Sequence, residues 1–171
     1  PVMEGKCVLF KEFGDVNAVP ICLDTQDTEE IIQTVKNIAP GFGGINLEDI
    51  SAPRCFEIEE RLKEILDISV FHDDQHGTAI VVLAGIINGL RVTGKKKEDC
   101  KVVVNGAGSA GVAITRLLLT YGFKHVTMCD REGIIGKDYP NLNWMQKKMT
   151  EVTNLENATG TLADALKGAD I

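Results

Sequence analysis

A glycine-rich turn that follows an apolar run carries the clearest chemical signal in this sequence. Residues 102–104 are three valines, and the pattern G-x-G-x-x-G follows them with Gly106, Gly108 and Gly111. In dinucleotide-binding folds the first glycine permits a tight turn, the second lets the backbone approach a pyrophosphate, and the third lets a helix pack closely on the strand. The phosphates then lie over the N-terminal amides of that helix. The context predicts a dinucleotide site, and a glycine-rich crossover without a ligand is the alternative.

An acidic residue lies where the ribose end of such a site is expected. A second apolar run over residues 126–129 ends in Asp130, which is 19 residues beyond Gly111. A carboxylate about 20 residues after the glycines hydrogen-bonds the ribose in NAD-binding folds. It would also repel the 2′-phosphate of NADP, although Arg131 follows directly and would neutralise part of that repulsion. We therefore expect NAD as the cofactor and leave NADP open.

Two pairs of adjacent carboxylates follow apolar runs that predict strands. Glu48 and Asp49 come after the first run, and Asp73 and Asp74 come after the second. The carboxyl ends of neighbouring parallel strands meet at one edge of a sheet, which would bring the pairs together. Clustered carboxylates need a compensating cation, and Mg²⁺ and Mn²⁺ prefer oxygen ligands. From spacing alone, helix caps or solvated loop charges remain the alternative.

Two histidines and a lysine near these carboxylates have more than one interpretation. His72 and His76 are four residues apart, a spacing that would suggest zinc on a helix. The segment indicates a strand-to-helix junction instead, so we expect His76 in the turn and His72 orienting the carboxylates. Lys6 would ordinarily be a surface charge. If it faced a cation or were desolvated, its pKa would fall toward the range of a general base.

The elements that must position these residues alternate between strands and helices. That alternation predicts an α/β fold with parallel strands, with a first lobe up to residue 75 and a Rossmann-type doubly wound sheet from residue 76. Residues 168–171 start a further strand, so the sheet is incomplete. The other predicted strands cover residues 7–10, 18–23, 43–47, 68–71, 102–104 and 126–129. The predicted helices follow Asp27, cover residues 56–66, start near Gly77 and at the glycine turn, and cover residues 144–152 and 162–167.

The composition sets further limits. The 171 residues are 44% hydrophobic, enough to bury a core, and the net charge of −7 disfavours binding to nucleic acid. The longest apolar stretch, residues 78–90, is shorter than the roughly 20 residues that span a bilayer, so we expect no membrane segment.

The five scattered cysteines form no C-x-x-C pair and are typical of reduced thiols in a cytoplasmic protein. The chain has neither a signal peptide nor an initiating Met and begins abruptly, so we expect a fragment.

Four motifs together resemble a known enzyme family. They are residues 1–6 (PVMEGK), residues 43–50 (GGINLEDI), residues 71–79 (FHDDQHGTA) and residues 104–108 (VNGAG). In this order they closely resemble the short, prokaryotic-type malic enzymes, and the resemblance extends over essentially the whole chain. The middle two motifs are highly specific, whereas many dehydrogenases share the glycine motif.

The resemblance implies a role for each motif residue. Lys6 would be the proton-accepting lysine. The implied ligands of a Mg²⁺ or Mn²⁺ ion are Glu48, Asp49 and Asp74, with Asp73 and Thr78 beside the metal and the cofactor. The cofactor-binding residues are Thr78, Gly106, Ala107, Gly108, Ser109, Ala110, Gly111 and Asp130. The family's proton-donating tyrosine would fall before Pro1 and its substrate-pocket asparagines after Ile171, which again indicates an internal fragment, inactive alone.

The reaction that the resemblance implies is the oxidative decarboxylation of malate to pyruvate and CO₂ with reduction of NAD(P), in a homodimer. The metal would chelate malate, Lys6 would accept the hydroxyl proton, and hydride would pass to the nicotinamide. One alternative is a metal-independent two-lobed dehydrogenase, such as an amino-acid dehydrogenase, which would not need the carboxylate pairs. Another is a non-catalytic dinucleotide-sensing module, which would not need Lys6 together with them.

Overall fold

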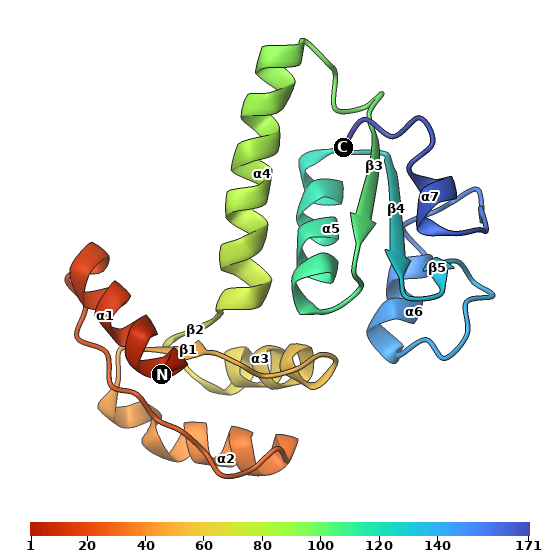
Figure 1. The fold of residues 1–171 in the computed structure, drawn as a ribbon. Helices are drawn as coiled ribbons and strands as arrows, with labels where there is room; N and C mark the ends of the chain where they lie inside the picture. Colours follow the sequence, from red (N-terminus) through yellow and green to blue (C-terminus); the bar gives the residue numbers. More distant parts are fainter.

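The computed structural model describes residues 1–171, which form two sheets with their covering helices (Figure 1). The first half contains a two-stranded parallel sheet of β1 (Gly44–Leu47) and β2 (Ser69–His72), packed against α2 (Thr28–Ile38) and α3 (Arg54–Ile65). The core of this half consists of Ile31, Ile32, Val35, Leu47, Ile58, Leu62 and Val70. The order of strands and helices confirms the predicted α/β architecture.

Helix α2 begins where the sequence predicts a cap. The side chain of Asp27 accepts a hydrogen bond of 3.0 Å from the backbone N–H of Glu30. The buried face of the helix carries apolar residues at helical spacing: Ile31, Ile32 and Val35. The helix gives way to a 3₁₀ turn, η1 (Ala39–Gly41), because Pro40 cannot donate the next helical hydrogen bond.

Two predicted strands are wrong. Residues 7–10 lie inside α1 (Val2–Gly14), which ends at Asp15 in a left-handed conformation. A four-residue apolar run fits a strand or a helical turn equally well, and here strong helix formers on both sides continue it as a helix. Residues 18–23 form no helix or strand, because no backbone hydrogen bond pairs them with a neighbour.

The second half contains a sheet in the order β3, β4, β5. The strands β3 (Lys101–Asn105) and β4 (His125–Asp130) are parallel, and α5 (Ser109–Tyr121) connects them. The short β5 (Gly133–Ile134) is antiparallel to β4, and the apolar pattern did not predict it. Helix α4 (Asp73–Thr93) packs alongside α5 (Figure 1). The core between these elements includes Cys100, Val102, Leu118, Phe123 and Val126.

Two short capped helices follow this sheet. They are α6 (Trp144–Thr150) and α7 (Leu162–Ala165), and each begins with a reciprocal capping box. The box at Thr161 confirms the predicted start of the last helix. After α7, the N–H of Asp170 donates to the carbonyl of Lys101 in β3 at 2.8 Å, and the N–H of Val103 donates to the carbonyl of Ile171 at 2.9 Å. These are the contacts expected of a further strand beside β3.

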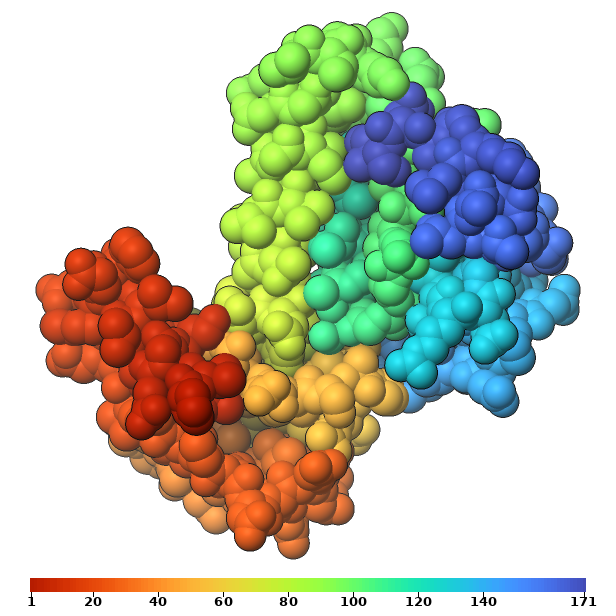
Figure 2. Space-filling view, in the orientation of Figure 1, coloured from red at the N-terminus to blue at the C-terminus, as the bar shows by residue number.

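Helix α4 starts earlier and is longer than predicted. It begins at Asp73, directly after His72 closes β2, whereas the sequence predicted a start near Gly77. Acidic residues in the first turn favour the earlier start because they interact well with the helix dipole. By length and composition alone, this 21-residue helix could cross a membrane, as can core helices of soluble proteins. One side packs on α5, and the space-filling view shows the other side open (Figure 2).

The glycine turn brings α5 close to the end of β3. Gly106 has a φ of 108°, a conformation that side-chain-bearing residues rarely adopt. A Cβ atom on Gly111 would lie 1.8 Å from the carbonyl oxygen of Gly106. The third glycine is therefore required for the close packing of the helix. A Cβ on Gly108 would have no atom within 4 Å, so this part of the turn is open to a ligand.

We predict that Gly111→Ala and Gly85→Ala have opposite effects on stability. At Gly111 the new methyl group meets a backbone carbonyl, so the free energy of unfolding should fall by about 1–3 kcal/mol. Gly85 lies inside α4 with nothing within 4 Å, so alanine there should stabilise the helix by roughly 0.5–1 kcal/mol. Urea denaturation followed by circular dichroism measures both. Equal stability of the two variants would contradict the steric role of Gly111.

Candidate functional site

Three carboxylates meet at the carboxyl ends of β1 and β2. The register pairs Leu47 with His72, so Glu48 and Asp73 leave the sheet at the same edge. Donor oxygens of Glu48, Asp73 and Asp74 all lie within 4.8 Å of one another. The convergence of the two acidic pairs, predicted from their position after the strands, is therefore seen for three of the four side chains.

Asp49 lies outside this group of carboxylates. Its φ is 60°, which is uncommon for a residue with a side chain, and the residue is exposed. The structure thus brings together two of the three implied metal ligands, Glu48 and Asp74, with Asp73 beside them. The role of Asp49 stays a prediction.

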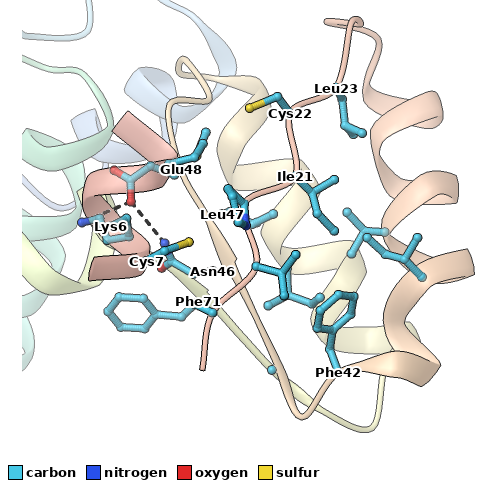
Figure 3. A pocket seen from close by; sticks show the side chains of 18 of the residues that line it. Lys6, Cys7, Ile21, Cys22, Leu23, Phe42, Asn46, Leu47, Glu48 and Phe71 are labelled. Carbon is cyan, nitrogen blue, oxygen red and sulfur yellow. Dashed lines mark hydrogen bonds and ion pairs between the residues drawn. The ribbon is translucent and has the colours of Figure 1, made fainter. Parts of the chain in front are cut away.

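The ammonium of Lys6 lies between two of the carboxylates. Its Nζ atom is 3.2 Å from Oε2 of Glu48 and 3.0 Å from Oδ2 of Asp73. Asn46 donates a hydrogen bond of 3.1 Å to the same oxygen of Glu48 (Figure 3). Only 24% of the Lys6 side chain is exposed, so it is not the solvated surface charge that its sequence context alone would suggest.

The carboxylates around Lys6 decide the direction of its pKa. Desolvation lowers this pKa, but hydrogen bonds from the ammonium to Asp73 and Glu48 outweigh it, and the net pKa lies above its ordinary value. A fall toward the range of a general base is expected where Lys6 faces a cation or is desolvated, and here the two carboxylates outweigh the effect of desolvation. Two carboxylates stabilise the charged form more than partial burial disfavours it.

The donor set suits a hard divalent cation. All three acidic side chains offer oxygen atoms, and a single ammonium leaves a net negative charge among them. The buried Oδ1 atom of Asn46, beside Glu48, has no hydrogen-bond partner. Such an orphaned carbonyl oxygen can accept a hydrogen bond from a water molecule or a substrate hydroxyl. The residues present therefore fit a Mg²⁺ or Mn²⁺ ion with further oxygen ligands.

The two histidines do not form a zinc site. His72 is fully buried, neither ring nitrogen has a partner, and burial lowers its pKa despite the nearby charge of Asp74. It makes no hydrogen bond to the carboxylates, so the expected orienting contact is absent. His76 lies within α4, not in a turn, and its Nε2 is 2.5 Å from the buried carboxylate of Glu59. Lys63 contacts the same carboxylate at 2.8 Å.

A cavity of about 870 Å³ opens beside Lys6. It lies between α1, residues 16–23, α2 and β1, and apolar side chains form most of its wall (Figure 3). The polar side chains of Lys6, Asn46 and Glu48 belong to the same wall. Sequence reasoning missed Asn46, although it lies in β1 two residues before Glu48, a spacing that places two side chains on the same side of an extended chain.

The predicted dinucleotide loop lies at the carboxyl end of β3. Residues 106–108 connect this strand to α5, whose first turn contains Gly111, and the parallel β4 ends beside them at Asp130. Oδ1 of Asp130 accepts a 2.9 Å hydrogen bond from the backbone of Arg131, and Oδ2 accepts one of 3.3 Å from Gln146. Thr78 is partly buried on α4, one turn beyond Asp74, and no contact to the loop supports its assignment.

The parallel β3–α5–β4 unit with its glycine turn, next to an acidic cluster with a lysine, defines a dinucleotide-binding enzyme fold with a candidate metal centre. Family models support this class: residues 1–63 match "Malic enzyme, N-terminal domain" and residues 75–169 match "Malic enzyme, NAD binding domain". The chain belongs to the malic enzyme family. Its second half is accordingly a Rossmann-like NAD-binding domain.

Known malic enzymes are similar to this protein over its whole length. It is 61% identical to the NAD-dependent malic enzyme of Geobacillus stearothermophilus, with 100% of this chain and 36% of that protein covered. It is 52% identical to the bifunctional malic/malolactic enzyme of Bacillus subtilis, covering 100% and 42%. The crystal structure of the NAD-dependent malic enzyme of Thermotoga maritima superposes with a TM-score of 0.96 at 52% identity, over 99% of this chain and 46% of that one. The chain thus spans less than half the length of these relatives.

We predict that the acidic cluster binds Mn²⁺ through Glu48 and Asp74. The test uses a full-length malic enzyme that carries this chain, for instance the Geobacillus stearothermophilus protein with its matching segment exchanged. Glu48→Gln and Asp74→Asn should each weaken Mn²⁺ binding at least about tenfold, because each removes a charged oxygen ligand. Calorimetric titration with Mn²⁺ measures the affinity.

Glu57→Gln is the matched control, because Glu57 is an exposed residue of α3 that pairs with Arg61. It should leave the Mn²⁺ affinity unchanged. Asp49→Asn then tests whether this neighbouring carboxylate takes part. An Asp74→Asn enzyme with unaltered Mn²⁺ affinity would contradict the proposed centre.

Proposed function

We propose that the full protein containing this chain catalyses the oxidative decarboxylation of malate to pyruvate and CO₂ with reduction of NAD(P). The observation that carries this proposal is Lys6, held by ion pairs between carboxylates that suit a divalent cation. The names of the relatives, NAD-dependent and NADP-dependent malic enzymes among them, support the same reaction.

The chain's own residues supply a proton acceptor and a charged pocket. Lys6 accepts the proton of the malate hydroxyl while the carbon that carries this hydroxyl loses hydride to the nicotinamide. To do so, the Lys6 ammonium must first lose a proton. Glu48 and Asp73, which now stabilise that ammonium, must then pair with another cation. When bound, the divalent cation supplies Lewis-acid polarisation of the oxygens of the hydroxy acid. The oxidised β-keto acid then loses CO₂ and takes up a proton to give pyruvate.

The cofactor is held by the glycine loop and Asp130. Backbone N–H groups at the start of α5 face the pyrophosphate, and Gly108 leaves room for its approach. Asp130 accepts hydrogen bonds from the adenosine ribose. We assign Ala107, Ser109 and Ala110 to the same phosphate loop and Thr78 to its border, in line with the resemblance of these motifs to the family's.

Further proposals concern the whole protein. Residues 1–75 belong to the substrate and metal domain and residues 76–171 to the NAD-binding domain, which the two matched ranges support. The metal is Mg²⁺ or Mn²⁺, the substrate is malate, and the full protein is a cytoplasmic homodimer. The net charge of −7 argues against nucleic acid as a partner.

We predict that Lys6→Ala in the full-length enzyme lowers kcat for malate oxidation by about a hundredfold or more, the range for loss of a positioned general base. The affinity for NAD should change little, because Lys6 lies in the first half of the chain, away from the glycine loop. Steady-state kinetics with malate, NAD and Mn²⁺ gives both values.

Lys11→Ala is the control on the same helix, because Lys11 is exposed and pairs only with Asp15. It should retain the parental rate. A Lys6→Ala enzyme as fast as the Lys11→Ala enzyme would show that Lys6 is not the proton acceptor. An intact full-length protein that binds NAD without oxidising malate would favour the dinucleotide-sensing alternative.

We also predict that the enzyme prefers NAD to NADP. The carboxylate of Asp130 accepts hydrogen bonds from a free ribose hydroxyl and repels a 2′-phosphate. Arg131 follows Asp130, but only its backbone N–H bonds to that carboxylate. Comparison of kcat/KM for the two cofactors tests the preference. A clear preference for NADP would show that the Arg131 side chain dominates.

A further inference from the structure

Gln146 of α6 joins the two parts of the predicted cofactor site. Its side-chain amide Nε2 lies 3.3 Å from Oδ2 of Asp130 and 3.4 Å from the carbonyl oxygen of Ala107. Asp130 ends β4, and Ala107 belongs to the glycine loop after β3. One amide group from a third element therefore bridges the ribose-side carboxylate and the phosphate loop.

The capping box of α6 fixes the direction of this amide. The backbone N–H of Asn143 donates to Oε1 of Gln146 at 3.1 Å, and the backbone N–H of Gln146 donates to Oδ1 of Asn143 at 2.9 Å. Because Oε1 is needed as the acceptor for Asn143, the NH₂ group must face the other way. Both of its neighbours there, the carboxylate and the carbonyl, are acceptors, so the orientation satisfies every group.

Helix α6 is itself held firmly against the loop. Met145 and Met149, on either side of Gln146 in the helix, are each 3% exposed. They belong to the same apolar cluster as Ala107 and Met128, which come from the glycine loop and from β4. The amide of Gln146 is thus placed by packing as well as by its cap.

The carboxylate of Asp130 has a second fixed contact. Its Oδ1 accepts the backbone N–H of Arg131 at 2.9 Å, and its Oδ2 accepts Gln146. With one donor on each oxygen, the carboxylate plane is set, and the remaining lone pairs can accept the two hydroxyls of a ribose. Removal of one donor would leave the group free to rotate.

We infer that Gln146 is a positioning residue for NAD: it orients Asp130 toward the ribose and ties it to the phosphate loop. This inference rests on the proposed function, because it assumes that NAD occupies the glycine loop. It assigns to α6, outside the glycine motif, part of the affinity and selectivity for the cofactor.

The decisive variant is Gln146→Glu in the full-length enzyme. Glutamate at this position keeps the acceptor of the capping box, so a merely structural role predicts no loss. If Gln146 positions Asp130, the new carboxylate oxygen replaces the donor and faces two acceptors, Asp130 and the carbonyl of Ala107, which it repels. We expect KM and Kd for NAD to rise about tenfold, the equivalent of one lost hydrogen bond and its repulsive replacement, with kcat at saturating NAD little changed.

Three further variants separate the possible causes. Lys147→Gln changes the net charge equally at an exposed neighbour in α6 and should leave the affinity for NAD unaltered. Asn143→Ala removes the side-chain half of the capping box and should also leave the affinity for NAD unaltered. Gln146→Met removes the donor without adding charge, and it also removes the capping acceptor; it should weaken NAD binding where Asn143→Ala does not, even if Gln146→Glu fails to fold.

Calorimetric titration with NAD alone gives Kd for each variant, and steady-state kinetics gives KM and kcat. Wild-type affinity in both Gln146 variants would overturn the inference while leaving the proposed function intact. Equal losses in Gln146→Glu and Lys147→Gln would overturn it in favour of a general charge effect. An unmodified enzyme that binds no NAD would overturn both the inference and the proposed function.

Discussion

The parallel pairing of β1 with β2 is the constraint on which the acidic site depends. Because Leu47 lies opposite His72, the residues that follow, Glu48 and Asp73, are forced to the same edge of the sheet. Their charges would repel each other, and the ammonium of Lys6 compensates part of this repulsion. No residue of α1 is buried, and its other side-chain ion pairs are local ones to the flanking residues Pro1 and Asp15. The N-terminal helix and the acidic cluster therefore stabilise each other.

Helix α4 connects this cluster with the dinucleotide loop. Its first turn carries Asp73 and Asp74, and further along it packs on α5, whose N-terminus closes the glycine turn. Glu59 of α3 contacts His76, which ties that first turn to the first half of the chain. Packed helices, not a flexible linker, thus set the separation of the two sites. In the reaction proposed for the full protein, such a fixed separation would hold the substrate in place relative to the nicotinamide.

The sequence predicted those elements that carry their own local signals. The Asp27 cap, the glycine turn and the Thr161 box depend on contacts within a few residues, so their residue types are enough to locate them. Residues 7–10 carried no such signal, and their apolar run was compatible with two structures. Residues 18–23 show the opposite limit: an extended, apolar segment becomes a strand only when another backbone pairs with it, and that pairing is not encoded in the segment itself.

The candidate site was predictable to the extent that strand ends defined it. Position after a strand was sufficient to bring Glu48, Asp73 and Asp74 together, but it could not distinguish Asp49 from its neighbour, because a change of one φ angle redirects a side chain. The pKa of Lys6 was not predictable, since it depends on the balance between desolvation and two hydrogen bonds to carboxylates distant in sequence. The same holds for Gln146, whose contact with Ala107 joins residues 39 positions apart, with α5, β4 and β5 between them. Local patterns identify which groups can do chemistry, whereas the charge state and orientation of those groups are set by contacts that only the folded chain makes.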